Sequence, residues 1–119
     1  MAQPAEISTR FAAALEERLN ESMPNTHQTA FKITVMAGQR FDRIVQEHVH
    51  GDKVDKYSRS VHAFVERSTG ALVKASGWKA PASSKTHPSG FAVRFDLSTE
   101  DGFNDAITKA TFSGGYLYA

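Results

Sequence analysis

The sequence predicts an α+β fold, a mostly antiparallel sheet of about five strands with an N-terminal helix and a short C-terminal helix. Apolar residues recur with helical spacing near both ends of the chain, and apolar and polar residues alternate in several segments between them. Short turn sequences join neighbouring alternating segments. The length of 119 residues fits one domain, so we predict a single α+β domain over residues 1–119.

The first predicted element is an amphipathic helix over about Pro4 to Ser22. Proline is favoured in a first helical turn, and "MPN" at residues 23–25 ends the pattern. We expect the apolar stripe of this helix to cover one face of the sheet. The stripe consists of Ile7, Phe11, Leu15 and Leu19.

Two hairpins are predicted after this helix. Residues 31–36 alternate, and "AGQR" at 37–40 is short enough to turn the chain into a strand over 41–49. Residues 61–66 alternate again, and "RSTG" at 67–70 supplies a turn in which Gly70 takes a left-handed conformation before the strand "ALVKAS". The intervening "HGDKVDKYS" at 50–58 is predicted to be a polar, mobile loop.

The clearest alternation in the chain lies near the C-terminus and predicts a central strand. Its apolar members are expected to face the interior, and Arg94 is expected to lie on the opposite face, because side chains alternate along a strand. These apolar members are Phe91, Val93, Phe95 and Leu97.

A short helix is predicted over about Thr99 to Ala110. Ser98 followed by Asp101 resembles a helix-start box, whereas Gly102 disfavours a helix. One face of this helix is apolar, with Phe103, Ala106, Ile107 and Ala110. The tail "TFSGGYLYA" at 111–119 is expected either to add an edge strand or to dock on the core.

The residue types and motifs argue against the common enzyme classes. The chain has no cysteine, which excludes disulfides, thiolate metal sites and thiol nucleophiles. It has no GxxxxGK[ST] phosphate loop, no strand-linked GxGxxG, no GxSxG elbow and no HExxH pair. We therefore predict that the protein is not an enzyme and needs no cofactor.

Charge and hydropathy narrow the setting in which the protein acts. Fourteen Lys+Arg against 13 Asp+Glu give a net charge of +1, too balanced for nucleic-acid binding through bulk charge. No apolar run approaches the roughly 18 residues of a spanning helix, and the N-terminus lacks a secretory pattern. The expected protein is intracellular or particle-associated and does not enter a membrane.

Histidines offer a different kind of site. His48 and His50 would lie on one face of a strand, and His62 and Asp52 would complete a metal site if the strands brought them together. The same histidines would serve as acid and base in phosphodiester cleavage. Surface histidines at a strand end explain the pattern equally well, so we predict folding without a bound metal.

The loop "ASGWKAPASSKTHPSGFAVRF" is the stronger candidate site. Trp78 supplies a ring for stacking on a base, Lys79 and Lys85 reach phosphate oxygens, and Arg94 suits bidentate phosphate contacts. These residues predict a pocket for a base-bearing anion. In the alternative, Trp78 closes the core at the end of a strand and the basic residues are solvated.

The C-terminal half resembles small uncharacterised proteins of tailed bacteriophages. The resemblance covers about residues 60–118 and rests on "SVHAFVERSTGALVKASGWKAPA", "VRFDL" and "GGYLY", while "SSKTHPSG" lengthens the loop. It implies phage origin and action in the host cytoplasm or in the virion. That group has no established catalytic residues, so none is transferred to this chain.

Three function classes follow from these observations. The first is a non-catalytic phage accessory protein that binds a nucleotide signal or single-stranded nucleic acid, and that would serve to counter host defence. The second is a virion or host-protein interaction module without a small-molecule ligand. The third is a small histidine-dependent nuclease or hydrolase. In every class the chain is expected to fold either by itself or as a small homo-oligomer.

Overall fold

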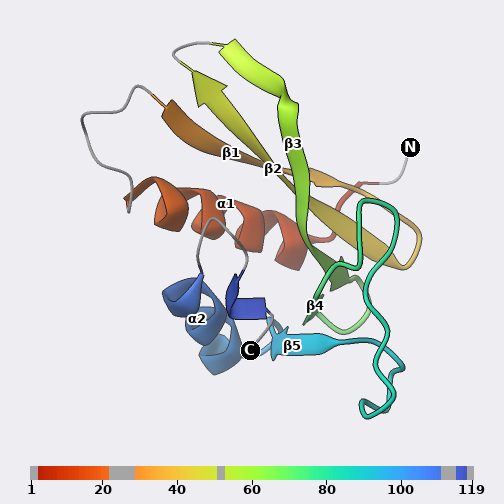
Figure 1. Cartoon of the computed structure of the whole chain (residues 1–119). Helices are drawn as coiled ribbons and strands as arrows, with labels where there is room; N and C mark the ends of the chain where they lie inside the picture. Colours follow the sequence, from red (N-terminus) through yellow and green to blue (C-terminus); the bar gives the residue numbers. More distant parts are fainter. Residues whose placement is uncertain (1–2, 22–28, 51–52, 111–114, 118–119) are drawn as a thin grey trace.

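A computed structural model describes residues 3–21, 29–50, 53–110 and 115–117 of the chain. Within these ranges it confirms the α+β fold, with two α-helices and a five-stranded sheet whose neighbouring strands all pair antiparallel, in the order β1-β2-β3-β4-β5 (Figure 1). The elements are α1 (Glu6–Glu21), β1 (Thr29–Met36), β2 (Phe41–His50), β3 (Lys53–Glu66), β4 (Ala71–Val73), β5 (Val93–Asp96), α2 (Glu100–Lys109) and the short 3-10 helix η1 (Gly115–Leu117).

Helix α1 follows the predicted amphipathic pattern. Phe11, Leu15 and Leu19 are at most 1% exposed and form the centre of the hydrophobic core. The helix begins two residues after Pro4, and the predicted stop at 22–25 lies outside the described residues. The apolar stripe therefore covers one face of the sheet, as the periodicity predicts.

The segment predicted as a loop at residues 50–58 belongs largely to strand β3, so that prediction is wrong. Strand β3 begins at Lys53, and its first residues pair with the end of β2, with Val49 opposite Val54 and His48 opposite Asp55. Backbone pairing rather than apolar alternation continues the hairpin here, which explains why the polar sequence gave no strand signal. Gly51 and Asp52 lie outside the described residues.

Strand β5 is also placed differently, because it lies at the end of the strand order and not in the centre of the sheet. The chain forms a meander, so the last strand can pair only with the three-residue β4 before it. Leu97 is buried and Phe95 packs against the core, whereas Arg94 is exposed, as the alternation predicts. Phe91 and Val93, also predicted to face the interior, lie outside the core cluster: Phe91 packs against Phe41, and Val93 pairs with Val73 after a register shift.

The C-terminal helix is confirmed, with its start displaced by one residue. Thr99, rather than Ser98, is the N-cap, and its side chain accepts a hydrogen bond from the Gly102 N–H at 3.0 Å. A Cβ at Gly102 would collide with the Asp96 carbonyl oxygen, so close packing on the preceding strand explains the glycine. Of the tail, η1 docks on the core through Leu117, which is 1% exposed.

The turn between β3 and β4 adopts the conformation that its sequence predicts. Gly70 has a φ of 77°, in the left-handed region that glycine enters without steric cost. Its N–H donates to the Glu66 carbonyl oxygen at 2.8 Å, and its carbonyl accepts from Leu97 at 2.9 Å. The turn thus connects the second hairpin to the end of β5.

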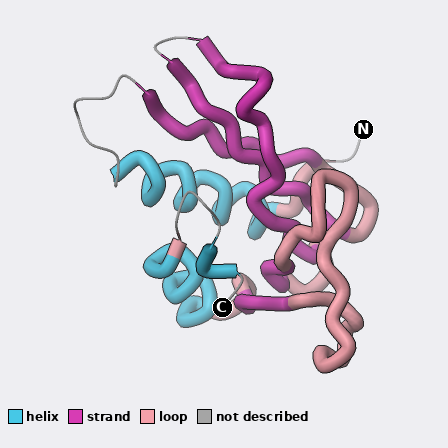
Figure 2. The backbone as a smooth tube through the Cα atoms, in the orientation of Figure 1, coloured by secondary structure: helices cyan, strands magenta, loops and turns pink. Residues whose placement is uncertain are grey.

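The two faces of the sheet have different covers. Helices α1 and α2 lie on one side, and the long segment between β4 and β5 lies on the other (Figure 2). Strand register places four residues in one row on the side away from the helices, namely Met36, Arg43, Phe64 and Val73. In the described ranges, neither helix is long and apolar enough to cross a bilayer.

The outer side of β1 is bonded to helix α1. The Asn20 side chain accepts from the Phe31 N–H at 2.8 Å and donates to the Phe31 carbonyl oxygen at 3.0 Å. The Glu16 carboxylate accepts from the Ile33 N–H at 2.9 Å. Helix side chains therefore take the hydrogen bonds that a further strand would otherwise make.

Candidate anion-binding surface

The segment between β4 and β5 folds into two small hairpins. Ala82 N–H donates to the Lys74 carbonyl oxygen at 2.7 Å and closes the first hairpin, over residues 74–82. Ser84 N–H donates to the Gly90 carbonyl oxygen at 2.9 Å inside the second, over residues 82–92. The two hairpins extend away from each other (Figure 1). Trp78 lies near the tip of the first hairpin.

Trp78 lies on two arginines of the sheet. The Arg43 guanidinium carbon is 5.0 Å from the centre of the indole ring, and that of Arg59 is 5.3 Å from it. Arg43 comes from β2 and Arg59 from β3. Trp78 stays 37% exposed, so the ring is held by cation–π contacts without being enclosed.

Met36 completes this end of the surface. Its sulfur lies 3.5 Å from an Arg59 guanidinium nitrogen and 3.8 Å from one of Arg43. Met36 is 36% exposed, and it and Trp78 are the two large hydrophobic residues that the described parts of the chain leave exposed. An apolar thioether, an indole and two cations therefore meet at one place on the surface.

Arg43 lacks an acidic partner. Among the described residues, no carboxylate lies within ion-pair distance of its guanidinium, and its buried Nε has no hydrogen-bond partner. Its contacts are the Met36 sulfur and the rings of Phe64 and Trp78. A guanidinium without a carboxylate partner is suited to an incoming anion.

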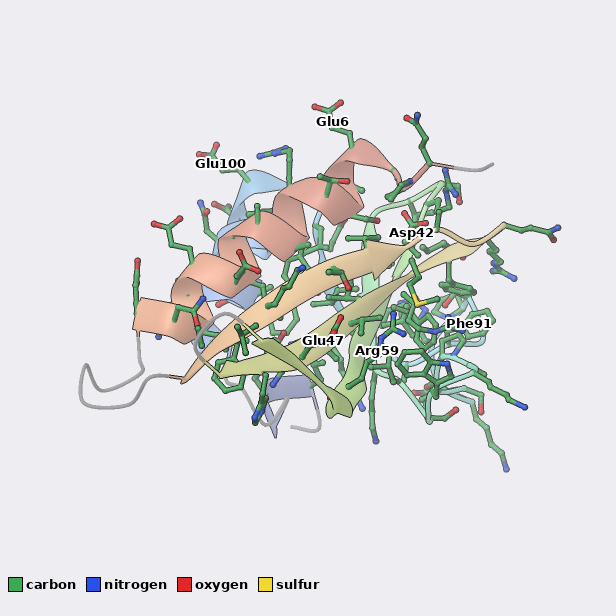
Figure 3. The ribbon with its side chains drawn as sticks, turned by 90° about the horizontal axis from the view of Figure 1, so that it is seen from above. Glu6, Asp42, Glu47, Arg59, Phe91 and Glu100 are labelled. Carbon is green, nitrogen blue, oxygen red and sulfur yellow. The ribbon has the colours of Figure 1, made fainter. Side chains whose placement is uncertain are left out.

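Aromatic and arginine contacts continue beyond Phe64. The Phe64 ring contacts Phe41 edge to face at 6.3 Å, and Phe41 contacts Phe91 at 4.9 Å. Arg40 lies over both, 5.3 Å from the Phe41 ring and 4.8 Å from the Phe91 ring. We name the continuous set the arginine–aromatic ladder, which consists of Arg40, Phe41, Arg43, Arg59, Phe64, Trp78 and Phe91. Figure 3 shows its members Arg59 and Phe91 on the side of the sheet away from α1.

The charge that the ladder presents to solvent is positive. The Arg40 side chain is 59% exposed while its partner Glu66 is 10% exposed, with 2.9 Å between Nε and Oε2. The Arg59 side chain is 43% exposed and its partner Glu47 13%, at 3.8 Å. Because the carboxylates are the buried members of both pairs, an approaching ligand meets the guanidinium groups first.

Comparison with known proteins adds one relationship. A model described as "Family of unknown function (DUF7717)" matches residues 3–119. The chain belongs to this family. No curated protein and no solved structure matches it. The family description names neither a source nor an activity, so the phage resemblance and the predicted function classes stay predictions.

The structure separates the four residues predicted as a pocket. Trp78 and Lys79 are neighbours in the first hairpin, and both are exposed. Lys85 lies in the second hairpin, also exposed. Arg94 lies on β5, where its Nε donates to the Leu117 carbonyl oxygen at 2.6 Å and ties the strand to η1. Only Trp78 and Lys79 therefore share one end of the ladder.

Arg43 and Arg59, which the sequence pattern did not single out, lie beside Trp78 in place of Lys85 and Arg94. Arg43 directly precedes the buried Ile44, and that alternation places it on the opposite face of β2. This pattern indicates an outward arginine on the strand. It does not indicate that a hairpin from a distant part of the chain folds over it.

The histidines predicted as a metal site do not form a cluster among the described residues. Within the described residues, no group of three histidine, aspartate or glutamate side chains is arranged to hold a metal. His48 packs edge to face on Phe31 at 4.9 Å. The side chains of His50 and Asp52 lie outside what the structure describes.

His62 has a structural environment instead. It is 7% exposed, with Nδ1 3.0 Å from the Gln46 amide oxygen and Nε2 2.6 Å from the Tyr116 hydroxyl. An amide oxygen only accepts, so Nδ1 carries the proton and Nε2 accepts from Tyr116. Burial lowers the pKa of His62 to about 4 and raises the pKa of the Tyr116 hydroxyl. Neutral His62 thereby fastens η1 to the sheet.

Two cavities lie away from the ladder's Trp78 end. One of about 400 Å³ lies between α1 and the start of α2, with Arg10 and Phe103 in its wall. The other, of about 250 Å³, is lined by residues that include Glu66, His87 and Asp96. Neither of these two is lined by Trp78, Arg43 or Arg59.

Proposed function

We propose that the protein binds a phosphate-bearing ligand that carries an aromatic base, a nucleotide signal or single-stranded nucleic acid, at Trp78. The observation that supports this most directly is the half-exposed indole beside two arginines, one of which has no acidic partner. Stacking accepts any base, and guanidinium groups bind phosphate oxygens in pairs. Together they match the two parts of a nucleotide.

Each residue has a distinct role in this proposal. Trp78 offers its exposed surface to a base, while Arg43 and Arg59 bind phosphate oxygens and hold the indole in place. Lys79, exposed beside Trp78 in the same hairpin, adds a second kind of cation. Arginine, lysine, thioether and indole groups are suited to ion-pair, hydrogen-bond and stacking contacts. The proposed role is accordingly binding without catalysis.

The biological setting in this proposal comes from the sequence resemblance. A phage accessory protein that acts in the host cytoplasm, for example against host defence, would meet nucleotide signals and single strands there. The positively charged outer surface of the ladder is compatible with such anions.

Fluorescence of the chain's only tryptophan tests the proposal directly. Addition of oligothymidylate or a cyclic dinucleotide should change Trp78 emission, and the affinity should fall as salt rises. Arg43→Gln and Arg59→Gln should each weaken binding about tenfold, because each removes a charged hydrogen-bond donor.

Arg10→Gln is the matched control for these variants. Arg10 lies on α1 and stacks on Phe103 at 5.1 Å, so the same cation–π contact is removed on the helix side. Its binding should equal that of the wild type. Unchanged emission with every ligand, in a folded protein, would refute the proposal.

A protein partner is a second candidate, favoured by one observation. Met36 and Trp78 are both exposed and adjacent through the arginines, as in the centre of many protein interfaces. Native mass spectrometry of the expressed protein distinguishes the two candidates. A bound nucleotide supports the first, and a stoichiometric protein partner or a second copy lost in Met36→Lys supports the second.

A further inference from the structure

The ladder has two ends that solvent can reach. At one end are Trp78, 37% exposed, and the Arg59 side chain, 43% exposed. At the other end the Arg40 side chain is 59% exposed above the half-buried Phe91. Phe64 links the two through Arg43 and Phe41 and is 3% exposed. The ladder therefore has two exposed stacks, which the buried Phe64 separates.

A single nucleotide carries one base and can therefore stack at only one of the two ends. Its base covers one ring, and its phosphate pairs with the cation beside that ring. A chain of nucleotides repeats base and phosphate along its length, as the ladder repeats ring and cation. The match between these two repeats selects a polymer over a monomer.

Duplexes are poorly suited to the same surface. Paired bases are stacked inside the double helix, so side-chain rings cannot reach their faces. A duplex would leave Trp78 and Phe91 unused and would contact the arginines alone. The aromatic members of the ladder thus favour a strand whose bases are free.

We propose that the ligand is a single strand of nucleic acid that spans the ladder from Trp78 to Arg40. This inference rests on the proposed function and specifies its ligand class. One base stacks at Trp78 and another at the Arg40–Phe91 end. Arg43, which has no carboxylate partner among the described residues, binds a phosphate between them.

The test is fluorescence anisotropy with labelled oligothymidylates of increasing length, from one nucleotide to about ten. Four proteins are compared, wild type and the variants Trp78→Ala, Arg40→Gln and Arg10→Gln. A melting curve for each variant establishes that it is folded. The same labelled strand in a duplex, and labelled polyglutamate, serve as the competing ligand classes.

The wild type should bind the longest strand at least tenfold more tightly than the mononucleotide. Arg40→Gln should weaken binding of the long strand about threefold or more, leave the mononucleotide unchanged, and lower the salt slope by about 0.7. Trp78→Ala should weaken both ligands, and Arg10→Gln neither.

Contrary results distinguish the spanning strand from the nucleotide site at Trp78. Affinity independent of length, or an Arg40→Gln variant that binds long strands like the wild type, overturns the spanning strand and leaves the nucleotide site at Trp78. Equal binding of the duplex or of polyglutamate also overturns it. If neither mononucleotide nor strand binds, the proposed function itself fails.

Discussion

The two faces of the sheet are held in different ways. On the helix side, Leu15 of α1 and the sheet residues Ile44 and Val65 are completely buried in one hydrophobic cluster. On the other side, aromatic rings lie under arginine side chains, of which Arg40 is 59% exposed. A cover of arginines stabilises the rings less than a helix does, but it leaves them within reach of a ligand. The comparison thus separates the part of the molecule that determines folding from the part available for binding.

The same strands supply both faces. In β2, Ile44 enters the core while Arg43 points to the other side, and in β3 Val65 and Phe64 divide in the same way. A bulge in β3 shifts the alternation by one residue just before Ala63, because His62 has no partner opposite it between the pairs Ile44–Ala63 and Val45–Val61. Side chains on the two faces can therefore be changed independently.

The largest expected effect is on the helix face. Leu15→Ala should lower the free energy of unfolding by roughly 2–5 kcal/mol, because Leu15 is 0% exposed and its loss leaves a cavity. Urea denaturation measures this change. Ligand binding by the folded variant should equal that of the wild type. A loss below about 1 kcal/mol would show that the core does not depend on this helix contact.

The next effect concerns pH. The pKa of His62 is about 4 in the folded protein and near 6.5 when unfolded, so the unfolded chain binds more protons between these values. The contribution of neutral His62 to the free energy of unfolding is complete above pH 6.5 and is lost as the pH falls towards 4. The expected loss is roughly 3 kcal/mol. Urea denaturation at pH 7 and at a pH just above 4 measures it.

His62→Gln provides the comparison for the pH effect. Glutamine does not titrate, so most of the decline in this interval should disappear. The hydrogen bond from Thr69 lowers the pKa of Glu66. This carboxylate therefore adds a separate loss of stability as the pH falls below its usual pKa of 4.5. An unchanged decline in His62→Gln would assign the effect to other groups.

The smallest expected effect on stability is at Trp78. Trp78→Ala should cost about 1 kcal/mol, since the exposed ring loses only its contacts with two partly exposed arginines. Thermal melting at matched ionic strength measures this cost. A loss of about 3–5 kcal/mol would instead identify Trp78 as a core residue, the alternative that the sequence left open.

Local patterns were sufficient for much of the fold. The stripe from Ile7 to Leu19 predicted α1, and the turn chemistry around Gly70 predicted the second hairpin, because these signals depend on neighbouring residues. The start of β3 was missed because its polar residues are held by backbone pairing with β2. The position of β5 was missed because alternation reports which face is buried, not where a strand lies in the order.

Of the candidate site, only Trp78 and the adjoining Lys79 were predictable from the sequence. Trp78 stood out as a lone tryptophan in a polar loop, and Lys79 adjoins it in sequence. Arg43 and Arg59 reach it through the pairing of β2 with β3 and through the fold of the first hairpin. Lys85 was expected beside Trp78 because one loop contains both, yet the loop divides into two hairpins and each residue lies in a different one.

The bonds from α1 to β1 have a consequence for how molecules meet. A strand at the end of a sheet ordinarily offers unpaired backbone groups on which a strand from another molecule can assemble, the first step towards open-ended aggregates. Here Asn20 and Glu16 already occupy those groups at Phe31 and Ile33. A second molecule would have to displace the helix before it could add a strand at these residues. Association of two copies is thus directed away from this edge and towards side-chain surfaces, where it can end at a defined number of subunits.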